Sequence, residues 1–183
     1  MMTKLKQPTK QIIIDAAIEL FNTNGYRGTT IRDIAKRANV NIANISYYFS
    51  GKQGLLEACV TDFFETYLLI YENGTNLHDV VYDVLAFQSS CPKLTRFVWR
   101  EMTLDSQLSR EVISSYLMKE RYYLRRLVAD EFLIIQLKSL LMMPYLNSQY
   151  VMKVWGIHPH DPYFLRKYSE LVHKWLEQQL VFQ

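Results

Sequence analysis

Apolar residues recur at helical spacing along most of this chain, and no segment shows the sustained alternation that is typical of a β-strand. The spacing predicts helices over 52–72, 77–90 and 92–103, and the first of them carries Leu55, Phe63 and Tyr67 on a broad apolar face. Asn73-Gly74 ends that helix, and Pro92 begins the third. The pattern therefore predicts an all-α chain.

The segment 104–143 contains neither Gly nor Pro. As a single helix it would be about 60 Å long, which is too long for a domain of this size. We expect a helix to begin near Asp105 or Ser106 and a break to fall near 129–132, where the apolar pattern changes register. Two strongly apolar helices are predicted over 133–143 and 163–180, and Asp161 is expected to cap the second.

Residues 26–56 show the most specific local pattern, because they combine helix caps with short helical periods. Thr29 or Thr30 can cap a first helix, and Asp33 completes a capping box with Thr30. The apolar residues of this helix share one face, and its basic residues lie off that face. The apolar set is Ile31, Ile34, Ala35 and Ala38, and the basic set is Arg32, Lys36 and Arg37.

A second short helix follows after a turn. Asn39 suits the left-handed backbone conformation in which helices often end, and Asn41 can cap a helix over 42–48. Ile45 and Phe49 would then point inward. Two short helices joined by a tight turn predict a helix-turn-helix, the motif that places its second helix in the DNA major groove.

The runs GTTIRDIA, ANV, NIANISYYF and GKQGLL resemble the N-terminal domain of the TetR family of repressors, continuously from Lys10 to Leu56. Asn39 replaces the usual Gly of the turn, and Asn41 replaces the usual Ser cap, which are both acceptable exchanges. The resemblance implies a three-helix helix-turn-helix DNA-binding domain at 1–54 and a helical dimerisation and regulatory domain at 55–183. It also implies a sequence-specific regulator of transcription that binds inverted repeats of double-stranded DNA as a homodimer.

Carried onto this sequence, the family pattern assigns DNA contacts at three places. The start of the first short helix and Lys52 would contact phosphates, the second short helix would face base edges, and two tyrosines would lie at the groove wall. Asn44 is the strongest candidate base reader, because an Asn amide can pair with adenine. The full set is Thr29, Thr30, Arg32, Asn41, Ile42, Ala43, Asn44, Tyr47, Tyr48 and Lys52.

The charge distribution agrees with DNA binding at one end of the chain. The net charge is +3, and residues 1–54 carry +5 while the remainder carries −2. No signal peptide and no membrane span is apparent, so we expect a cytoplasmic, nucleoid-associated protein. Cys59 and Cys91 are expected to be free thiols, and a disulfide between them is the less favoured alternative.

The last two apolar helices are candidates for dimerisation. In TetR-like proteins these helices pair with their copies in a second subunit, whereas ordinary core packing is the alternative interpretation. The candidate interface residues are Leu133, Leu137, Leu140, Leu141, Tyr168, Leu171, Val172 and Trp175.

Other candidate chemistry is weaker. The run His158-Pro159-His160 lacks the helical spacing of a metal site, so no metal site is expected. His78 and His173 are interpreted as surface or bundle residues. No catalytic arrangement and no phosphate-binding loop is found, so we expect neither an enzyme nor a cofactor.

Aromatic and methionine side chains of the second half allow two interpretations. They could line a pocket for a small-molecule effector, but core packing is the leading interpretation. The set includes Tyr82, Phe87, Phe97, Trp99, Met102, Tyr116, Met118, Tyr122, Met142 and Met143.

The runs LTRFVWREMTLDS, LKSLLMMPYL and HPHDPYF resemble the RefZ-type branch of TetR-like proteins from spore-forming bacilli. That resemblance implies an alternative function, in which a DNA-bound regulator of cell division acts on the division protein FtsZ. Its partner surface would be basic, and a solvated face with local ion pairs is the competing interpretation. The candidate residues are Arg96, Arg100, Arg110, Arg121 and Arg126.

Overall fold

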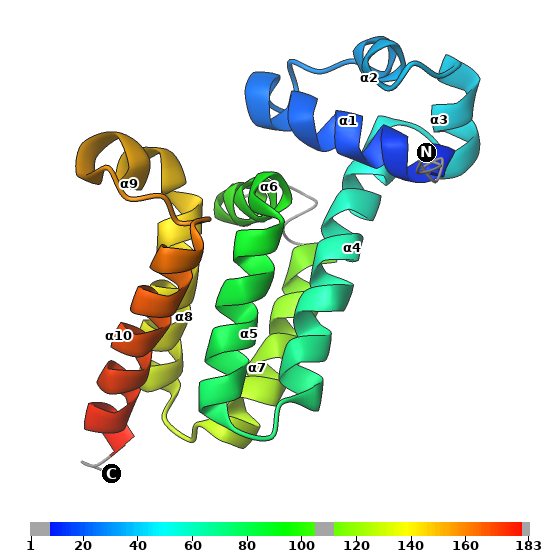
Figure 1. Cartoon of the computed structure of the whole chain (residues 1–183). Coiled ribbons are helices and arrows are strands. Elements are labelled where there is room, and N and C mark those ends of the chain that lie inside the picture. Colours follow the sequence, from blue (N-terminus) through cyan, green and yellow to red (C-terminus); the bar gives the residue numbers. More distant parts are fainter. Residues whose placement is uncertain (1–7, 105–111, 181–183) are drawn as a thin grey trace, which may run out of the picture. The chain divides into compact units, whose positions relative to one another are not determined.

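The computed structural model describes residues 8–104 and 112–180. These residues are helical with no strand, which confirms the all-α prediction (Figure 1). The chain divides into two compact units, 1–62 and 63–183, within one long helix, and each unit is described by itself. The boundary predicted after residue 54 lies in the same helix, nearer its start.

The first unit has α1 (Thr9–Asn24), α2 (Ile31–Ala38), α3 (Ile42–Phe49) and the first part of α4 (Lys52–Asn73). Its core draws apolar side chains from all four helices, with Phe21, Ile34, Ile45 and Leu55 fully buried. Cys59 is buried in the same core, and burial raises the pKa of its thiol. Each short helix therefore contributes only a few anchors to a shared core.

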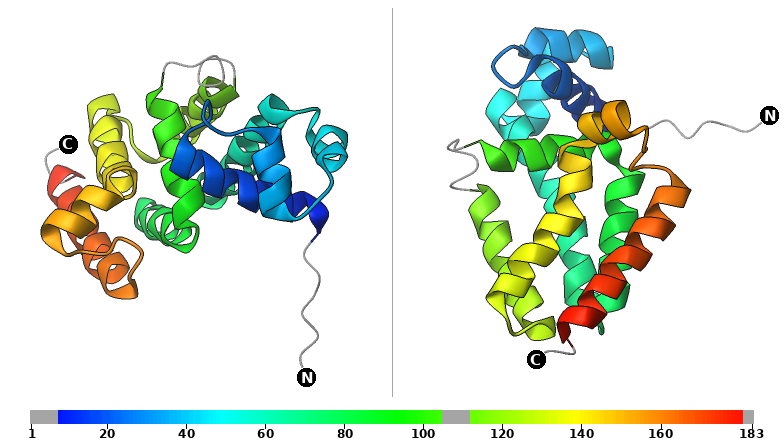
Figure 2. Two further views of the ribbon diagram at one scale, coloured as in Figure 1. Left: turned by 90° about the horizontal axis from the view of Figure 1, so that it is seen from above. Right: turned by 90° about the vertical axis from the view of Figure 1, so that its left-hand side faces the viewer.

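The second unit contains the rest of α4 and the helices that follow it (Figures 1 and 2). Figure 2 shows α8 (yellow) and α10 (orange to red) side by side, and α10 also packs on α5. The helices after α4 are α5 (Leu77–Ser90), α6 (Pro92–Thr103), α7 (Ser114–Leu127), α8 (Glu131–Leu146), α9 (Ser148–Trp155) and α10 (Pro162–Leu180).

The predicted break in the long segment is confirmed. Helix α7 ends at Leu127, and α8 begins at Glu131 after Asp130, whose carboxylate accepts hydrogen bonds from the backbone N–H groups of Phe132 and Leu133. The start predicted near Asp105 or Ser106 lies outside the described residues.

Two features of the second unit differ from the sequence prediction. Helix α8 does not end at Met143 but continues through Pro144 to Leu146. Pro144 has no N–H to donate to the carbonyl of Leu140, one turn earlier, and the Tyr168 hydroxyl of α10 donates to that carbonyl instead, at 2.9 Å. Helix α9 was not predicted from the sequence at all.

Cys59 and Cys91 are free thiols, and Cys91 is half-buried. In the described part of the chain, no helix has the length and apolar character that crossing a membrane requires.

Candidate nucleic-acid interface

Helix α2 is held at both ends by the residues that the sequence indicated. The Thr30 hydroxyl accepts a hydrogen bond from the Asp33 N–H at 3.2 Å, and the Asp33 carboxylate accepts one from the Thr30 N–H at 2.9 Å. Asn39 ends the helix in the left-handed conformation, with φ 53°. The capping box and the left-handed turn are therefore confirmed.

Helix α3 follows with its own cap, because the Asn41 side chain accepts from the Ala43 N–H at 2.9 Å. Ile45 and Phe49 are buried and fix the inner face, as predicted. The outer face exposes Ile42, Tyr47 and Tyr48.

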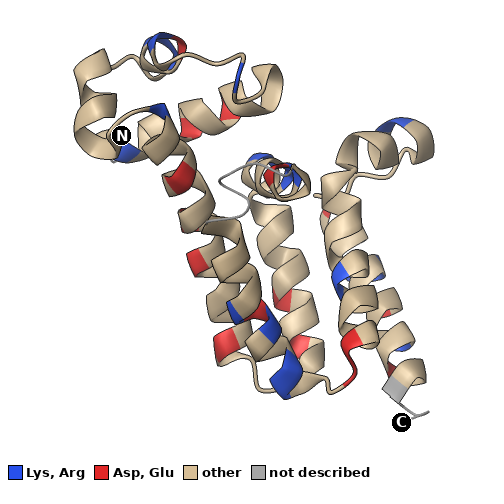
Figure 3. Ribbon diagram, turned by 180° about the vertical axis from the view of Figure 1, so that it is seen from behind, with Lys and Arg blue, Asp and Glu red and all other residues tan. Residues whose placement is uncertain are grey.

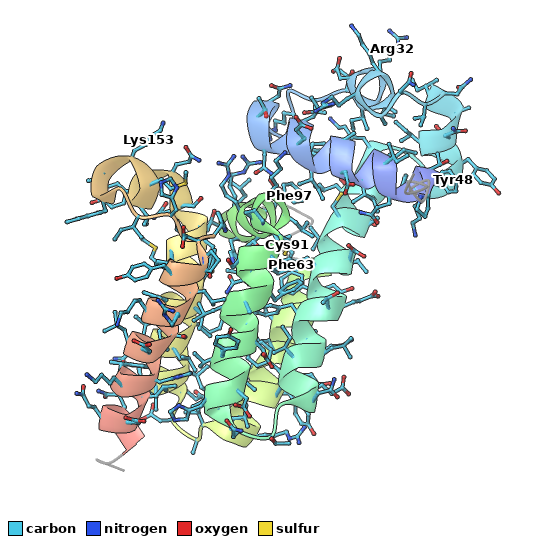
Figure 4. All side chains as sticks on the ribbon, in the orientation of Figure 1. Arg32, Tyr48, Phe63, Cys91, Phe97 and Lys153 are labelled. Carbon is cyan, nitrogen blue, oxygen red and sulfur yellow. The ribbon has the colours of Figure 1, made fainter. Side chains whose placement is uncertain are left out.

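Tyr47 and Tyr48 lie at the outer surface of α3. Tyr47 is 81% exposed and Tyr48 is 43% exposed, and their rings meet edge to face with centroids 5.0 Å apart. Figure 4 shows Tyr48 pointing away from the helix. Tyr48 therefore belongs to the surface of α3 and not to the core.

The polar residues of α3 differ in exposure. Asn44 is half-buried, and Ala43 and Ser46 are exposed beside Ile42. Ser46 was not selected from the sequence, although its place one turn beyond Ile42 puts it on the same outward face. The available surface of α3 carries amide, hydroxyl, methyl and phenol groups and no charge.

Thr29 and Thr30 have different environments. Thr29 is fully buried, and its hydroxyl lies 2.8 Å from the Gly25 carbonyl and 3.2 Å from the Leu20 carbonyl. The prediction that Thr29 contacts phosphate is therefore corrected, because its side chain joins α1 to the connection before α2. Thr30 is exposed, but its hydroxyl is already engaged with Asp33.

Lys52, at the start of α4, is half-buried. Its ammonium donates to the carbonyls of Tyr26 at 3.0 Å and Thr29 at 2.9 Å, and it lies 4.2 Å from the centre of the Tyr26 ring. Lys52 therefore fixes the connection between α1 and α2, whether or not its third N–H meets a phosphate.

The basic residues of α2 lie in two environments. Arg37 pairs with Glu19 of α1. Arg32 and Lys36 are exposed one turn apart, and Figure 4 shows Arg32 pointing outward. The positive charge of α2 is visible in Figure 3. Arg32 and Lys36 thus form the cationic edge of this helix.

The predicted dimer residues separate into two groups within the second unit. Leu133, Leu137, Leu141 and Val172 are buried inside a single chain, so they form its core and offer no surface to a second copy. The other residues, Leu140, Tyr168, Leu171 and Trp175, are partly or fully exposed. The predicted interface set therefore combines core residues and surface residues of the same two helices.

Two shallow grooves border these exposed residues. The first, of about 600 Å³, lies between α8 and α10 and includes Ile135, Met143, Tyr168 and Trp175. The second, of about 550 Å³, lies along α10 and the loop before it and includes Tyr163, Tyr168 and Leu171. Tyr168 lines both grooves, so the apolar surface is continuous along α10.

The candidate arginine surface is partly engaged in ion pairs. Arg121 lies 2.7 Å from Glu131, and Arg125 lies 3.4 Å from the same carboxylate. Arg100 lies 3.8 Å from Glu101. Burial raises the pKa of Glu101, and the opposing effect of the Arg100 charge is smaller. Arg96 is half-buried, Arg126 is exposed, and Arg110 lies outside the described residues. Local ion pairs thus account for Arg121.

The histidines contribute to packing between elements. His173 of α10 lies with its Nε2 3.0 Å from the backbone oxygen of His78 on α5. The His160 ring lies tilted against the Tyr145 ring, with centroids 5.6 Å apart, and burial lowers the pKa of its imidazole. Asp161 accepts from the Tyr163 N–H at 2.7 Å, which confirms it as the cap of α10.

Only some of the aromatic and methionine residues are core residues. Phe97 and Trp99 are fully buried, as the core interpretation predicted. The exposed members of the set are Tyr82, Met118, Tyr122 and Met143.

Comparison with known proteins agrees with this geometry. The family model described as bacterial regulatory proteins, tetR family, matches residues 13–59, which include α2, α3 and the start of α4. The chain is 44% identical to the probable HTH-type transcriptional regulator YttP of Bacillus subtilis (strain 168), with 94% of each chain covered.

Two further similarities are narrower. The chain is 38% identical over 80 residues to IcaR of Staphylococcus aureus (strain Newman), a negative transcriptional regulator of the biofilm operon icaADBC, covering 42% of this chain and 43% of IcaR. The crystal structure of FadR from Bacillus subtilis in complex with stearoyl-CoA superimposes with a TM-score of 0.65 at 20% identity, covering 88% of this chain and 96% of FadR. At that identity the likeness concerns the fold.

Proposed function

The chain belongs to the tetR family of bacterial regulatory proteins and is a transcriptional regulator of that type; on this premise, we propose that it represses transcription as a homodimer bound to inverted-repeat DNA. The observation that carries the proposal is the outward face of α3. Its groups are exposed while Ile45 and Phe49 hold the helix to the core. A helix fixed in this way presents its outer side chains to the major groove at low entropic cost.

The composition of α3 supports a preference for A·T base pairs. Asn44 can pair with adenine through its amide, and Ile42 and Ala43 can contact thymine methyl groups. Guanine is most often read by Arg or Lys, and α3 has neither. We therefore expect the half-site read by α3 to be rich in A·T pairs.

Phosphate contacts would fix the position of the helix on DNA. Arg32 and Lys36 supply exposed charge, and the N-terminus of α2 supplies backbone N–H groups. Lys52 has a double role in this proposal, because its ammonium also holds the carbonyls of Tyr26 and Thr29. Its replacement would therefore weaken both the phosphate contact and the loop.

The homodimer would form through the exposed residues of α8 and α10. Leu140, Tyr168, Leu171 and Trp175 lie along the continuous apolar surface described above, and Ile135 and Met143 extend it on α8. Inverted half-sites one turn of DNA apart would require the two recognition helices of such a dimer to lie about 34–36 Å apart.

The test is a pair of binding titrations with specific and random DNA over a range of salt. Asn44→Ala should relax the preference at one base pair of each half-site and cost about 1–3 kcal/mol there. The matched control, Asn24→Ala, makes the same change at an exposed position of α1 and should leave specificity unchanged. Equal loss on both DNAs would show that Asn44 reads no base.

The same titrations separate charge from specificity. Arg32→Ala should weaken binding to both DNAs and reduce the salt slope by about 0.9 for each phosphate lost. Arg37→Ala removes the same charge from the same helix, but that guanidinium is paired with Glu19, so its effect on the slope should be smaller. An equal effect of both variants would mean that Arg32 makes no specific phosphate contact.

The alternative is a RefZ-type function, in which the DNA-bound protein acts on an FtsZ-like partner through basic residues. Arg126 supports it best among the described candidates, because it is exposed while Arg121 is paired with Glu131. Arg126→Glu should then abolish partner binding and leave DNA affinity unchanged. Promoter-proximal binding sites in the native host, with derepression by a small molecule, would favour the repressor instead.

A further inference from the structure

The interior of the second unit contains an aromatic corner that holds a cation. The rings of Tyr67 on α4 and Trp99 on α6 stand nearly perpendicular, at 79°, with centroids 5.5 Å apart. The ammonium of Lys138 on α8 lies 4.9 Å from the centre of the Trp99 ring and 5.2 Å from the centre of the Tyr67 ring. Both distances are within the range of cation–π attraction.

A buried carboxylate completes the environment of this ammonium. Glu120 of α7 is 3% exposed and pairs with Lys138. The Tyr67 hydroxyl donates to Glu120 at 2.8 Å and accepts from Lys138 at 3.0 Å. Because the Tyr67 proton goes to Glu120, the Tyr71 hydroxyl, at 2.9 Å, donates to Tyr67. The lysine head is therefore held by an anion, the Tyr67 hydroxyl and the Trp99 ring.

Both tyrosines stay neutral in this environment. Burial, together with the charge of Glu120, raises the pKa of Tyr67 and of Tyr71 well above the ordinary value. The ion-pair partner of the Lys138 ammonium in this hydrogen-bonded group is the Glu120 carboxylate.

The walls of the corner have their own supports. The Trp99 indole N–H donates to the Gln88 side-chain oxygen at 2.6 Å, and the Gln88 amide donates to the Leu141 carbonyl at 3.0 Å. Phe63 stacks on Tyr67 with ring centroids 5.5 Å apart and planes 18° apart. None of these contacts uses Lys138, so removal of its side chain should leave the corner standing.

We propose that Tyr67, Trp99 and Glu120 form a binding site for a primary alkylammonium group, and that Lys138 fills this site in the free protein. The side chain of Lys138 is itself an alkylammonium, so the structure shows which chemistry the site accepts. Stability alone does not require the pair, because well-packed apolar replacements of buried ion pairs are often as stable. Lys138 is 18% exposed while Glu120 is 4% exposed at the side chain, so the site opens to solvent on the lysine side, from which an external amine would enter.

The test is to remove the internal cation and supply an external one. Lys138→Ala should be stabilised by n-propylammonium chloride in a saturable way, with a rise in Tm, whereas propanol and sodium chloride at equal concentration should not stabilise it. In a Trp155→Phe/Trp175→Phe background, Trp99 is the one tryptophan that remains of the chain's three. Its fluorescence should change along the same binding curve. Absence of saturable binding would overturn the proposal.

Three further variants make the result specific. Adding Glu120→Gln to Lys138→Ala should weaken propylammonium binding at least tenfold, because the anion is lost. Lys138→Met fills the space with an apolar side chain, so this variant should also bind propylammonium at least tenfold more weakly than Lys138→Ala. Lys167→Ala removes an exposed lysine that pairs with Glu170 and should create no site. Equal binding by the Lys138→Ala and Lys138→Met variants would contradict a site at this position.

The design remains decisive if Lys138→Ala does not fold in buffer. Propylammonium should then restore its helical circular dichroism signal, and propanol should not. The proposal would be overturned if the amine did not restore the helical signal. A folded Lys138→Met variant would show that the unit tolerates loss of the charge. DNA binding is not measured in these experiments, so their outcome is independent of the proposed repressor function.

Discussion

Helices α3 and α10 show two different ways in which a sequence specifies a surface. Helix α3 is short, and the residues that fix it lie in its own segment. The Asn41 side chain caps the helix by accepting from the Ala43 N–H, and the buried residues of the helix are Ile45 and Phe49. The outward face of α10 is decided by distant residues. Tyr168 bonds the carbonyl of Leu140, and His173 contacts His78, which is 95 positions away. A surface set by local contacts can be predicted from sequence, whereas one set by tertiary contacts cannot.

The largest effect expected from this comparison concerns two neighbouring residues of α10. Val172 is 2% exposed and Leu171 is 61% exposed. Val172→Glu should destabilise the second unit by about 3 kcal/mol or more, because a carboxylate would be buried without a partner. Leu171→Glu should leave the fold intact and convert the proposed dimer to monomers. Urea denaturation and analytical ultracentrifugation measure the two outcomes.

This pair of variants can fail in two informative ways. An intact dimer in Leu171→Glu would move the interface away from the exposed face of α10. A folded, stable Val172→Glu would mean that this face of α10 separates easily from α5 and α8. The control is Glu170→Ala, which changes an exposed residue of the same helix and should affect neither measurement.

The sequence predicted most of what depends on neighbouring residues. The capping box of Thr30, the left-handed Asn39 and the break before α8 were all visible, because each depends on residues within a few positions. The burial of Thr29 was not visible, because its hydroxyl reaches the Leu20 carbonyl in another helix. The faces of α8 and α10 were mixed for the same reason.

The internal chemistry of the second unit was also beyond sequence analysis. Tyr67, Glu120 and Lys138 come from three helices, and no periodicity links them. Pro144 gave a misleading signal, because a proline usually ends a helix, and here a hydroxyl from α10 replaces the missing donor.

A middle-sized effect is therefore expected at Tyr168. Tyr168→Phe should cost about 1–3 kcal/mol of the free energy of unfolding, because the Leu140 carbonyl loses its donor. Adding Pro144→Ala should recover much of that loss, since an alanine N–H can donate to the same carbonyl. The double-mutant cycle is best measured in the Leu171→Glu background, so that dimerisation does not contribute. Strictly additive effects would show that the two residues do not share this carbonyl.

The smallest effect concerns the local surface, at the cap of α2. Thr30→Ala should cost about 1 kcal/mol in the stability of the first unit, because the capping bond to the Asp33 N–H is lost. Thr30→Ser keeps the hydroxyl and is the matched control, which should remain within a few tenths of a kcal/mol of the wild type.

The same cap predicts a pH dependence with a definite sign. Hydrogen bonds from the Thr30 hydroxyl and backbone, followed by the charge of Lys36, lower the pKa of Asp33 below its ordinary value of 3.8. A carboxyl whose pKa is lower in the folded state stabilises the fold above its ordinary pKa, and that contribution is lost as the pH falls through the folded value. Titration of the Asp33 carboxyl by NMR should give a pKa closer to 3.8 in Thr30→Ala than in the wild type or in Thr30→Ser. An unchanged pKa in Thr30→Ala would mean that the hydroxyl does not hold this carboxylate, and the local specification of α2 would then depend on its backbone alone.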